Sequence, residues 1–281
     1  MLPWMIRVQR LFESPFATVD RVDHPADVPH VDPPEERSDR LTINFIERGE
    51  FHVAHAGGTL TLDRDALFVT TPGQINRYSH SAGDCAPDDV VLAVGFGTLD
   101  DDYVMRGAAS RLAARAPIVP LSNRRAYLRH RLLSHLENGA DTMALDSIAG
   151  ELLHATVGAD GRCRFEPSQV SWYAPRVDAA RRLLDDDYAS RHMLTVLVEG
   201  AGMSPFHFAR VFCELAGAPP HRYLVRRRLH AAADRLRAGD SLTNACYAVG
   251  FSSLSQFIHA FRRRFGVSPS RVTGGRDTTP S

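Results

Sequence analysis

Between residues 242 and 269 the apolar positions recur at helical spacing in two short runs. The first run predicts a helix whose apolar face is formed by Leu242, Ala245, Cys246 and Val249. Gly250 then ends this helix, since glycine takes the left-handed conformation of a helix end without strain. The second run begins after two candidate N-cap residues, Ser252 and Ser253. It predicts a helix that buries one phenylalanine per turn, at Phe257, Phe261 and Phe265.

The same pattern occurs once before in the chain. The first helix and turn repeat at an offset of 48 residues, with Leu194, Leu197, Val198 and Gly202 matching Leu242, Ala245, Cys246 and Gly250. After the turn the offset is 49 residues, with Ser204, Phe208 and Phe212 matching Ser253, Phe257 and Phe261. A repeat at a fixed offset indicates a duplicated structural unit. The sequence therefore predicts two helix-turn-helix units, at 194–215 and 242–264, whose second helices would enter the DNA major groove.

A long helix is predicted between the two units, over residues 223–236, and Gly239 ends it. Another begins at Arg176, so the all-α C-terminal domain is expected over residues 176–273. Residues 158–175 are rich in glycine, proline and polar residues, and we place an interdomain linker at 166–175.

The N-terminal part of the chain, residues 1–165, has a different pattern. Short strand patterns, separated by glycine and polar turns, begin at Leu41 and end at Phe96, while the proline- and aspartate-rich residues 1–40 suggest an irregular or edge segment. Short strands at this spacing predict a small antiparallel barrel or sandwich whose interior could hold a ligand. Two amphipathic helices follow, one from Ser122 to Gly139 and one over residues 143–157, which makes the predicted fold class α+β.

Charge is divided unevenly between the two parts. Residues 1–170 hold 17 Arg against 24 Asp and Glu, a net charge of −7, whereas residues 171–281 hold 16 Arg against 9 Asp and Glu, a net charge of +7. An acidic domain joined to a basic one indicates that only the second seeks nucleic acid. No apolar run approaches the length of a membrane span, and the first residues lack the features of a signal peptide, so we expect a cytoplasmic protein without a membrane partner.

Residues 176–272 resemble the DNA-binding domain of the AraC/XylS family of bacterial transcription regulators. The resemblance rests on Leu194, Leu197, residues 201–204, Arg210, Phe212, Gly217, Tyr223, Leu224, Arg228, Leu229 and the run G-F-S-S-L-S-Q-F-I-H-A-F-R-R-R-F-G-V-S-P at 250–269. It implies seven helices, with the long helix linking two units rigidly. It also implies promoter DNA, RNA polymerase and a small-molecule effector as partners, and a homodimer as a further candidate assembly.

Residues 1–165 resemble the cupin-like effector-binding and dimerisation domain of the same family, chiefly through T-L-T-L-D-R-D-A-L-F-V-T-T-P-G-Q-I-N. Where such domains often have histidine after P-G-x-x, this chain has Asn76. His52, His55 and His80 do not form the His-x-His and Glu cluster typical of a cupin metal site, so neither a metal nor another cofactor is expected. Cys85 has no nearby cysteine in sequence, which favours an inert thiol over a redox sensor.

The four aligned phenylalanines, Phe208, Phe212, Phe257 and Phe261, are expected to be core residues. The exposed or polar positions of the same helices are then the candidates for DNA contact. Arg can pair with guanine, Gln with adenine, and an apolar side chain can touch the thymine methyl group, although any one of them could instead contact phosphate. These candidates are Phe206, His207, Ala209 and Arg210 in the first helix, and Leu254, Ser255, Gln256, His259 and Arg262 in the second.

Three functional classes are consistent with these patterns. The first is a DNA-binding transcription regulator, expected to be an activator, that responds to a small molecule bound by the N-terminal domain. The second is a DNA-binding regulator whose N-terminal domain only dimerises or binds a protein partner. The third is a cupin enzyme fused to a DNA-binding domain, which is disfavoured because the sequence contains no nucleophile motif, phosphate loop or paired-carboxylate signature. We therefore predict a protein that is not an enzyme.

A C-terminal fragment starting near Val170 should fold alone and bind duplex DNA. Its affinity should fall steeply between about 50 and 200 mM salt, because arginine–phosphate contacts release counterions from the duplex. Circular dichroism and fluorescence anisotropy with a labelled duplex measure the two properties. An unfolded fragment, or binding that is insensitive to salt, contradicts the prediction.

Overall fold

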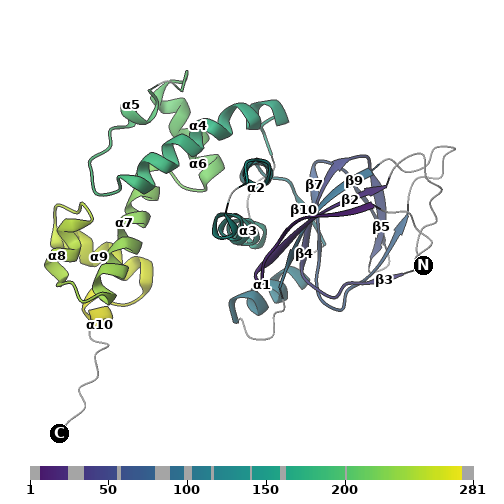
Figure 1. Cartoon of the computed structure of the whole chain (residues 1–281), viewed down its shortest axis with the longest axis horizontal. Coiled ribbons are helices and arrows are strands. Elements are labelled where there is room, and N and C mark those ends of the chain that lie inside the picture. The colour runs from purple at the N-terminus through teal and green to yellow at the C-terminus, as the bar shows by residue number, and fades with distance from the viewer. Residues whose placement is uncertain are drawn as a thin grey trace, which may run out of the picture. The chain divides into compact units, whose positions relative to one another are not determined.

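The computed structural model describes residues 7–24, 35–55, 58–79, 89–97, 103–114, 117–139, 141–158, 163–199 and 201–273 of the 281 in the chain. His80 and Cys85 lie outside these residues. The chain divides into two compact units, Met1–Ser171 and Trp172–Ser281. The first contains all the described strands and the second is built from helices, so the fold is α+β, as predicted (Figure 1).

The strands of the first unit form two antiparallel sheets. The strands are β1 (Arg7–Glu13), β2 (Ala17–His24), β3 (Glu36–Arg37), β4 (Thr42–Arg48), β5 (Phe51–His55), β6 (Gly58–Leu62), β7 (Ala66–Thr70), β8 (Ile75–Ser79), β9 (Asp89–Phe96) and β10 (Ile118–Pro120). The larger sheet has the order β1-β2-β9-β4-β7-β10, and the smaller has the order β3-β8-β5-β6.

The prediction of a β-barrel is therefore wrong in its detail, since the described strands make two sheets and not one closed barrel. The two sheets separate between β4 and β5, where Gly49 turns the chain with φ 77°. β4 pairs with β7 and β9 in one sheet, and β5 pairs with β6 and β8 in the other. A core of Ile46, Phe51, Val53, Leu62, Phe68 and Val91 is buried in this unit.

Five predicted strands, β4, β5, β6, β7 and β9, are present. Residues 1–40 were predicted to be an irregular or edge segment: β1 is an edge strand of the larger sheet, whereas β2 is neither irregular nor at an edge. Here β2 lies inside the larger sheet, paired with β1 on one side and with β9 on the other. Ala17 and Val19 are buried while Thr18 between them is partly exposed, which is the alternation of a half-buried strand. Only two strongly buried side chains mark this strand, so the surrounding proline and aspartate obscured it.

Three helices complete the first unit: α1 (Tyr103–Ala113), α2 (Asn123–Glu137) and α3 (Thr142–Val157). The last two confirm the predicted helices, including the N-cap at Ser122, whose Oγ accepts a hydrogen bond from the Arg125 amide. The Arg125 side chain is buried and donates to the backbone carbonyls of Pro120, Ala155 and Gly158 at 2.8, 2.8 and 3.1 Å. It thereby holds α2 against the end of α3 and against β10.

The segment predicted as a linker, residues 166–175, is helical from Pro167 onward. Helix α4 runs continuously over Pro167–Asp186 and crosses the boundary between the two units at Ser171. Pro167 starts the helix at a position where its missing amide hydrogen costs nothing, and Pro175 lies inside it. The proline and serine content that suggested a linker marks the first turn of a helix, and Val170 also lies within α4.

Helices α5 to α10 follow in the second unit. They are α5 (Leu194–Leu197), α6 (Pro205–Ala216), α7 (Pro220–Arg237), α8 (Leu242–Ala248), α9 (Leu254–Phe265) and α10 (Pro269–Thr273). With α4 they make seven helices among the described residues from 167 to 273, the number that the resemblance implies. The two copies of the repeat are α5–α6 and α8–α9, although α5 has four residues where α8 has seven.

The long helix α7 is shared by both copies. Near its N-terminal end, the Tyr223 ring packs against Phe212 of α6, with ring centroids 5.7 Å apart. Near its C-terminal end, residues from Leu229 to Leu236 join the buried cluster that contains Phe257 and Phe261. Phe208, Phe212, Phe257 and Phe261 are all fully buried, as predicted. One rigid helix therefore supplies part of the core of each helix-turn-helix unit.

Gly250, between α8 and α9, is constrained in two ways. Its φ is +87°, a left-handed conformation that favours glycine, and an added Cβ would stand 2.2 Å from the Ala189 carbonyl oxygen. The close approach is fixed by Arg228 on α7. Its guanidinium donates to the carbonyls of Gly250 at 2.9 Å, Tyr188 at 2.7 Å and Ser190 at 2.7 Å.

Gly250→Ala should therefore destabilise the second unit much more than Gly266→Ala does. Gly266 has a similar φ of +74°, but nothing lies within 4 Å of its added Cβ. The control should cost about 1–2 kcal/mol of unfolding free energy from backbone strain alone. Gly250→Ala should cost roughly 2–5 kcal/mol, because the clash with backbone adds to that strain. Urea denaturation followed by circular dichroism measures both, and equal losses would contradict the proposed contact.

Candidate nucleic-acid interface

Helices α6 and α9 are bounded by the same two devices. Ser204 and Ser253 are the N-caps, and their hydroxyl oxygens accept from the amides of His207 at 3.3 Å and Gln256 at 3.4 Å. Gly217 and Gly266 end the helices in the left-handed conformation. The two residues of each pair are 49 positions apart in the sequence, so α6 and α9 begin and end at equivalent residues. We call this shared arrangement of caps and helix ends the duplicated helix frame. Equivalent positions of α6 and α9 therefore present equivalent faces.

On α6, the predicted contact residues differ in their exposure to solvent. Phe206 is 82% exposed and Arg210 is exposed, whereas His207 and Ala209 are partly buried. Both nitrogens of the His207 ring are engaged, since Nε2 lies 3.2 Å from the Tyr173 hydroxyl and Nδ1 lies 3.4 Å from Nη2 of Arg210. The arginine N–H must donate to Nδ1, which places the ring hydrogen on Nε2. His207 thus joins α4 to Arg210.

On α9, the side chains of Ser255, Gln256, His259 and Arg262 are exposed. Leu254 is partly buried against the core cluster of this unit. The last turn adds Arg263 and Arg264, so α9 carries three arginines, whereas α6 carries one. The two helices share a frame but differ in charge, with α9 the more basic.

Arg264 is also held in place from α7. Its Nη2 donates to Nε2 of His230 at 3.2 Å. Burial lowers the pKa of His230, and the neighbouring positive charge of Arg264 lowers it further. The imidazole is therefore favoured in its neutral form, which is the form that can accept this hydrogen bond.

The turn between α5 and α6 and the turn between α8 and α9 are each held by an arginine from another helix. Arg176 on α4 donates from Nε to the Ala201 carbonyl at 2.9 Å and stacks on Trp172, with its guanidinium carbon 3.6 Å from the ring centroid. Arg228 on α7 donates to the Gly250 carbonyl. Sequence reasoning did not assign these roles, nor that of Tyr173. Nothing in the spacing of a lone arginine shows which distant carbonyl it will reach.

The first unit contains a cavity of about 340 Å³ lined by both sheets. Phe51, Phe68 and Val91 give it an apolar part, and the hydroxyls of Thr42 and Thr70, 2.6 Å apart, give it a polar wall. His24 Nδ1 lies 3.0 Å from an Asp89 carboxylate oxygen at the same cavity. Burial raises the pKa of Tyr78, another lining residue, to about 12, so its hydroxyl remains protonated. The lining comes partly from the strands between Leu41 and Phe96, in which the sequence suggested a ligand site, and partly from Val22, His24 and residues 36–40, which precede them.

The sequence also led us to expect neither a metal site nor a membrane-spanning segment. Among the described residues, no group of three or more His, Cys, Asp or Glu side chains is arranged to hold a metal ion. His52 Nδ1 lies 3.0 Å from the Thr61 hydroxyl on the adjoining strand. In the described part of the chain, no helix combines the length and the apolar character needed to cross a membrane.

Comparison with known proteins agrees with this geometry. A family model described as a helix-turn-helix domain matches residues 197–274. A probable transcriptional regulator, LumQ of Photobacterium leiognathi, is 29% identical over 151 residues, which cover 50% of this chain and 58% of LumQ. The transcriptional activator RhaS of Escherichia fergusonii is 33% identical over 97 residues, or 34% of this chain and 35% of RhaS. The chain thus spans between about a third and three fifths of the length of these relatives.

Solved structures of similar proteins also exist. A probable AraC family transcriptional regulator from Rhodopseudomonas palustris is 24% identical, with a TM-score of 0.34. That comparison covers 35% of this chain and 94% of the other. Assignment of the DNA-binding unit rests on the family model, the named relatives and the duplicated helix frame.

The aligned positions Arg210 and His259 should contribute unequally to DNA affinity, because a guanidinium presents five N–H donors and an imidazole at most two. His259→Arg should bind a mixed-sequence duplex more tightly than wild type, because it adds a charged donor at an exposed position of α9. Arg210→Ala should cost about 1–3 kcal/mol of binding free energy on the preferred sequence. Fluorescence anisotropy with a labelled duplex measures both, and an unchanged affinity in His259→Arg would exclude a phosphate contact at this position.

Proposed function

We propose that this chain, which belongs to the AraC/XylS family through its C-terminal helix-turn-helix domain, is a sequence-specific transcription regulator controlled by a small molecule bound in its N-terminal unit. The observation that carries the proposal is the duplicated helix frame, in which α6 and α9 have matched serine N-caps and matched left-handed glycine ends. Two such helices joined by α7 can read two segments of one duplex. The net charge of +7 over residues 171–281 favours binding to DNA phosphates.

The two helices would contribute differently. On α6, Phe206 and Ala209 offer apolar surface for thymine methyl groups, and Arg210, positioned by His207, offers a guanidinium to guanine. On α9, Ser255, Gln256, His259 and Arg262 offer polar contacts to bases or phosphates, while Leu254 is the least accessible of the five. Arg263 and Arg264 add positive charge next to them. Helix α6 would therefore select bases mainly through apolar contacts, and helix α9 would hold the DNA mainly through its positive charge.

In the first unit, the cavity between the sheets is the proposed effector site, in a cupin-like domain without a resident metal. Its apolar residues, threonine hydroxyls and protonated Tyr78 suit a small ligand with an apolar part and a few hydrogen-bonding groups. The lining also includes charged residues of both signs: Glu36, Arg37, Asp39, Arg40 and Asp89. The relative RhaS is named as an activator, which favours activation here too. An activator would also need to meet RNA polymerase at the promoter, and a homodimer would double the DNA contacts.

Selection from a random duplex library with the full chain tests DNA recognition. Enriched sequences should contain two short segments about one helical turn apart, or about 10–10.5 bp, as expected for two linked recognition helices. Arg210→Ala should relax one segment and Gln256→Ala the other. Arg7→Ala, which removes an exposed charge from β1 in the first unit, is the control and should leave both unchanged. No enrichment over the input library would reject sequence-specific recognition.

A reporter strain tests the sensor role. Removal of residues 1–165 should abolish the dependence of transcription on any inducing condition while leaving DNA binding in place. If regulation survives the deletion, the N-terminal unit does not sense the signal, and the alternative that it only dimerises or binds a protein partner is favoured.

A further inference from the structure

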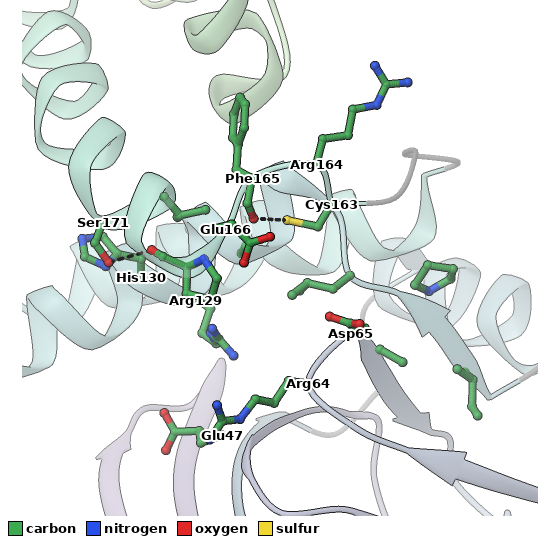
Figure 2. Close-up of a pocket in the computed structure, with 17 residues that line it drawn as sticks. Glu47, Arg64, Asp65, Arg129, His130, Cys163, Arg164, Phe165, Glu166 and Ser171 are labelled. Carbon is green, nitrogen blue, oxygen red and sulfur yellow. Dashed lines mark hydrogen bonds between the residues drawn. The ribbon is translucent and has the colours of Figure 1, made fainter.

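A second and larger cavity in the first unit lies on the helical side of its sheets (Figure 2). Its volume is about 810 Å³, and its walls come from the β6–β7 turn, β10, α2 and the segment that leads into α4. It shares no lining residue with the cavity between the sheets. Its lining also differs in charge, because it includes three arginines, Arg64, Arg129 and Arg164, and three acidic residues, Glu47, Asp65 and Glu166.

One end of this cavity is positive. Arg129 from α2 and Arg64 from the β6–β7 turn both line it, and neither forms a hydrogen bond or a close ion pair with another described residue. The guanidinium carbon of Arg129 lies 5.7 Å from the ring centroid of Phe45, so one face of the cation is covered by an apolar ring. Burial lowers the pKa of Arg129, Glu47 opposes this effect, and the positive charge of Arg64 adds to it.

Glu47 does not balance the two arginines. Its carboxylate is already bound by Arg21, whose Nε donates to Oε2 at 3.0 Å. The other acidic lining residues, Asp65 and Glu166, are exposed, and neither is among the charges that shift the pKa of Arg129. The Arg129 end therefore holds at least one positive charge that the chain leaves uncompensated, and a partly buried cation of this kind gains free energy from an anion.

Part of the rest of the wall is apolar, although Asp65, His130, Cys163, Arg164, Glu166 and Ser171 also line the cavity. The apolar part indicates a ligand that is larger than an inorganic ion. Beyond the arginines, the lining includes Ile118, Pro120, Leu121, Phe165 and Val170. A volume of about 810 Å³ is also within the range of cavities that hold small organic ligands. One surplus positive charge next to apolar walls fits a ligand with one negative group and a hydrocarbon body.

We propose that this cavity is a binding site for a small organic monoanion, whose carboxylate lies between Arg129 and Arg64 and whose apolar body lies against Leu121, Phe165 and Val170. The site is distinct from the proposed effector site between the sheets, and it does not depend on the DNA-binding function. Its wall includes the first turn of α4, which continues into the second unit.

Isothermal titration of the full chain with three carboxylates of different shape tests the site: cyclohexanecarboxylate, hexanoate and phenylacetate. At least one should bind, while the corresponding neutral amide and inorganic phosphate should not. Arg129→Gln should weaken binding by about 10- to 100-fold, because it removes a charge-assisted hydrogen bond. Glu47→Gln should strengthen it, since it removes the opposing negative charge.

The matched control is Arg164→Gln. Arg164 also lines the cavity, and its substitution by Gln removes one positive charge, as Arg129→Gln does. However, Arg164 is exposed and its side chain points away from Arg129 in Figure 2. This variant should bind as wild type does, and circular dichroism of each variant verifies that it is folded. Binding that Arg129→Gln and Arg164→Gln weaken equally would show a general charge effect and overturn the proposal. Equal binding of the amides, binding of phosphate alone, or no binding by any of the three carboxylates would also overturn it.

Discussion

The second unit depends on one side chain, Arg228, which has no acidic hydrogen-bond partner in the part of the chain that the structure describes. Its guanidinium donates there to four backbone carbonyls, at Tyr188, Ala189, Ser190 and Gly250. Burial lowers its pKa, and these four oxygens supply the compensation that a carboxylate would otherwise give. The contact brings the loop after α4 and the turn before α9 against α7. The orientation of α9, and of every side chain on its exposed face, therefore depends on a residue that is remote in sequence from that helix.

The two copies of the repeat share a frame but have diverged in the parts that need not be shared. Serine caps and left-handed glycines are preserved, because they fix where α6 and α9 begin and end. The turns are secured differently, by Arg176 from α4 in one copy and by Arg228 from α7 in the other. The exposed faces differ most, with an apolar Phe206 on α6 and three arginines on α9. The two copies thus share their caps and helix ends, whereas the exposed side chains that would contact DNA differ between them.

Local patterns predicted the second unit better than the first. Helices α6 and α9 follow from phenylalanine spacing, serine caps and glycine ends, all of which act within a few residues. In contrast, β2 carries only Ala17 and Val19 as strongly buried positions, and its place inside a sheet depends on β1 and β9. The candidate contacts on α6 and α9 were found from helical periodicity. The hydrogen bonds of His207 to Tyr173 and Arg210 were not, because they join side chains that sequence spacing does not relate.

Helix α4 combines continuity with a local loss of stiffness. It passes through the boundary between the units at Ser171 without a break. Four residues later stands Pro175, which has no amide hydrogen, so the Ser171 carbonyl lacks its usual helical partner. Bending a helix stretches its hydrogen bonds, and the resistance is lowest where one of them is missing. Helix α4 is therefore not uniformly stiff, and a sideways load on this helix would be taken up first around Ser171 and Pro175.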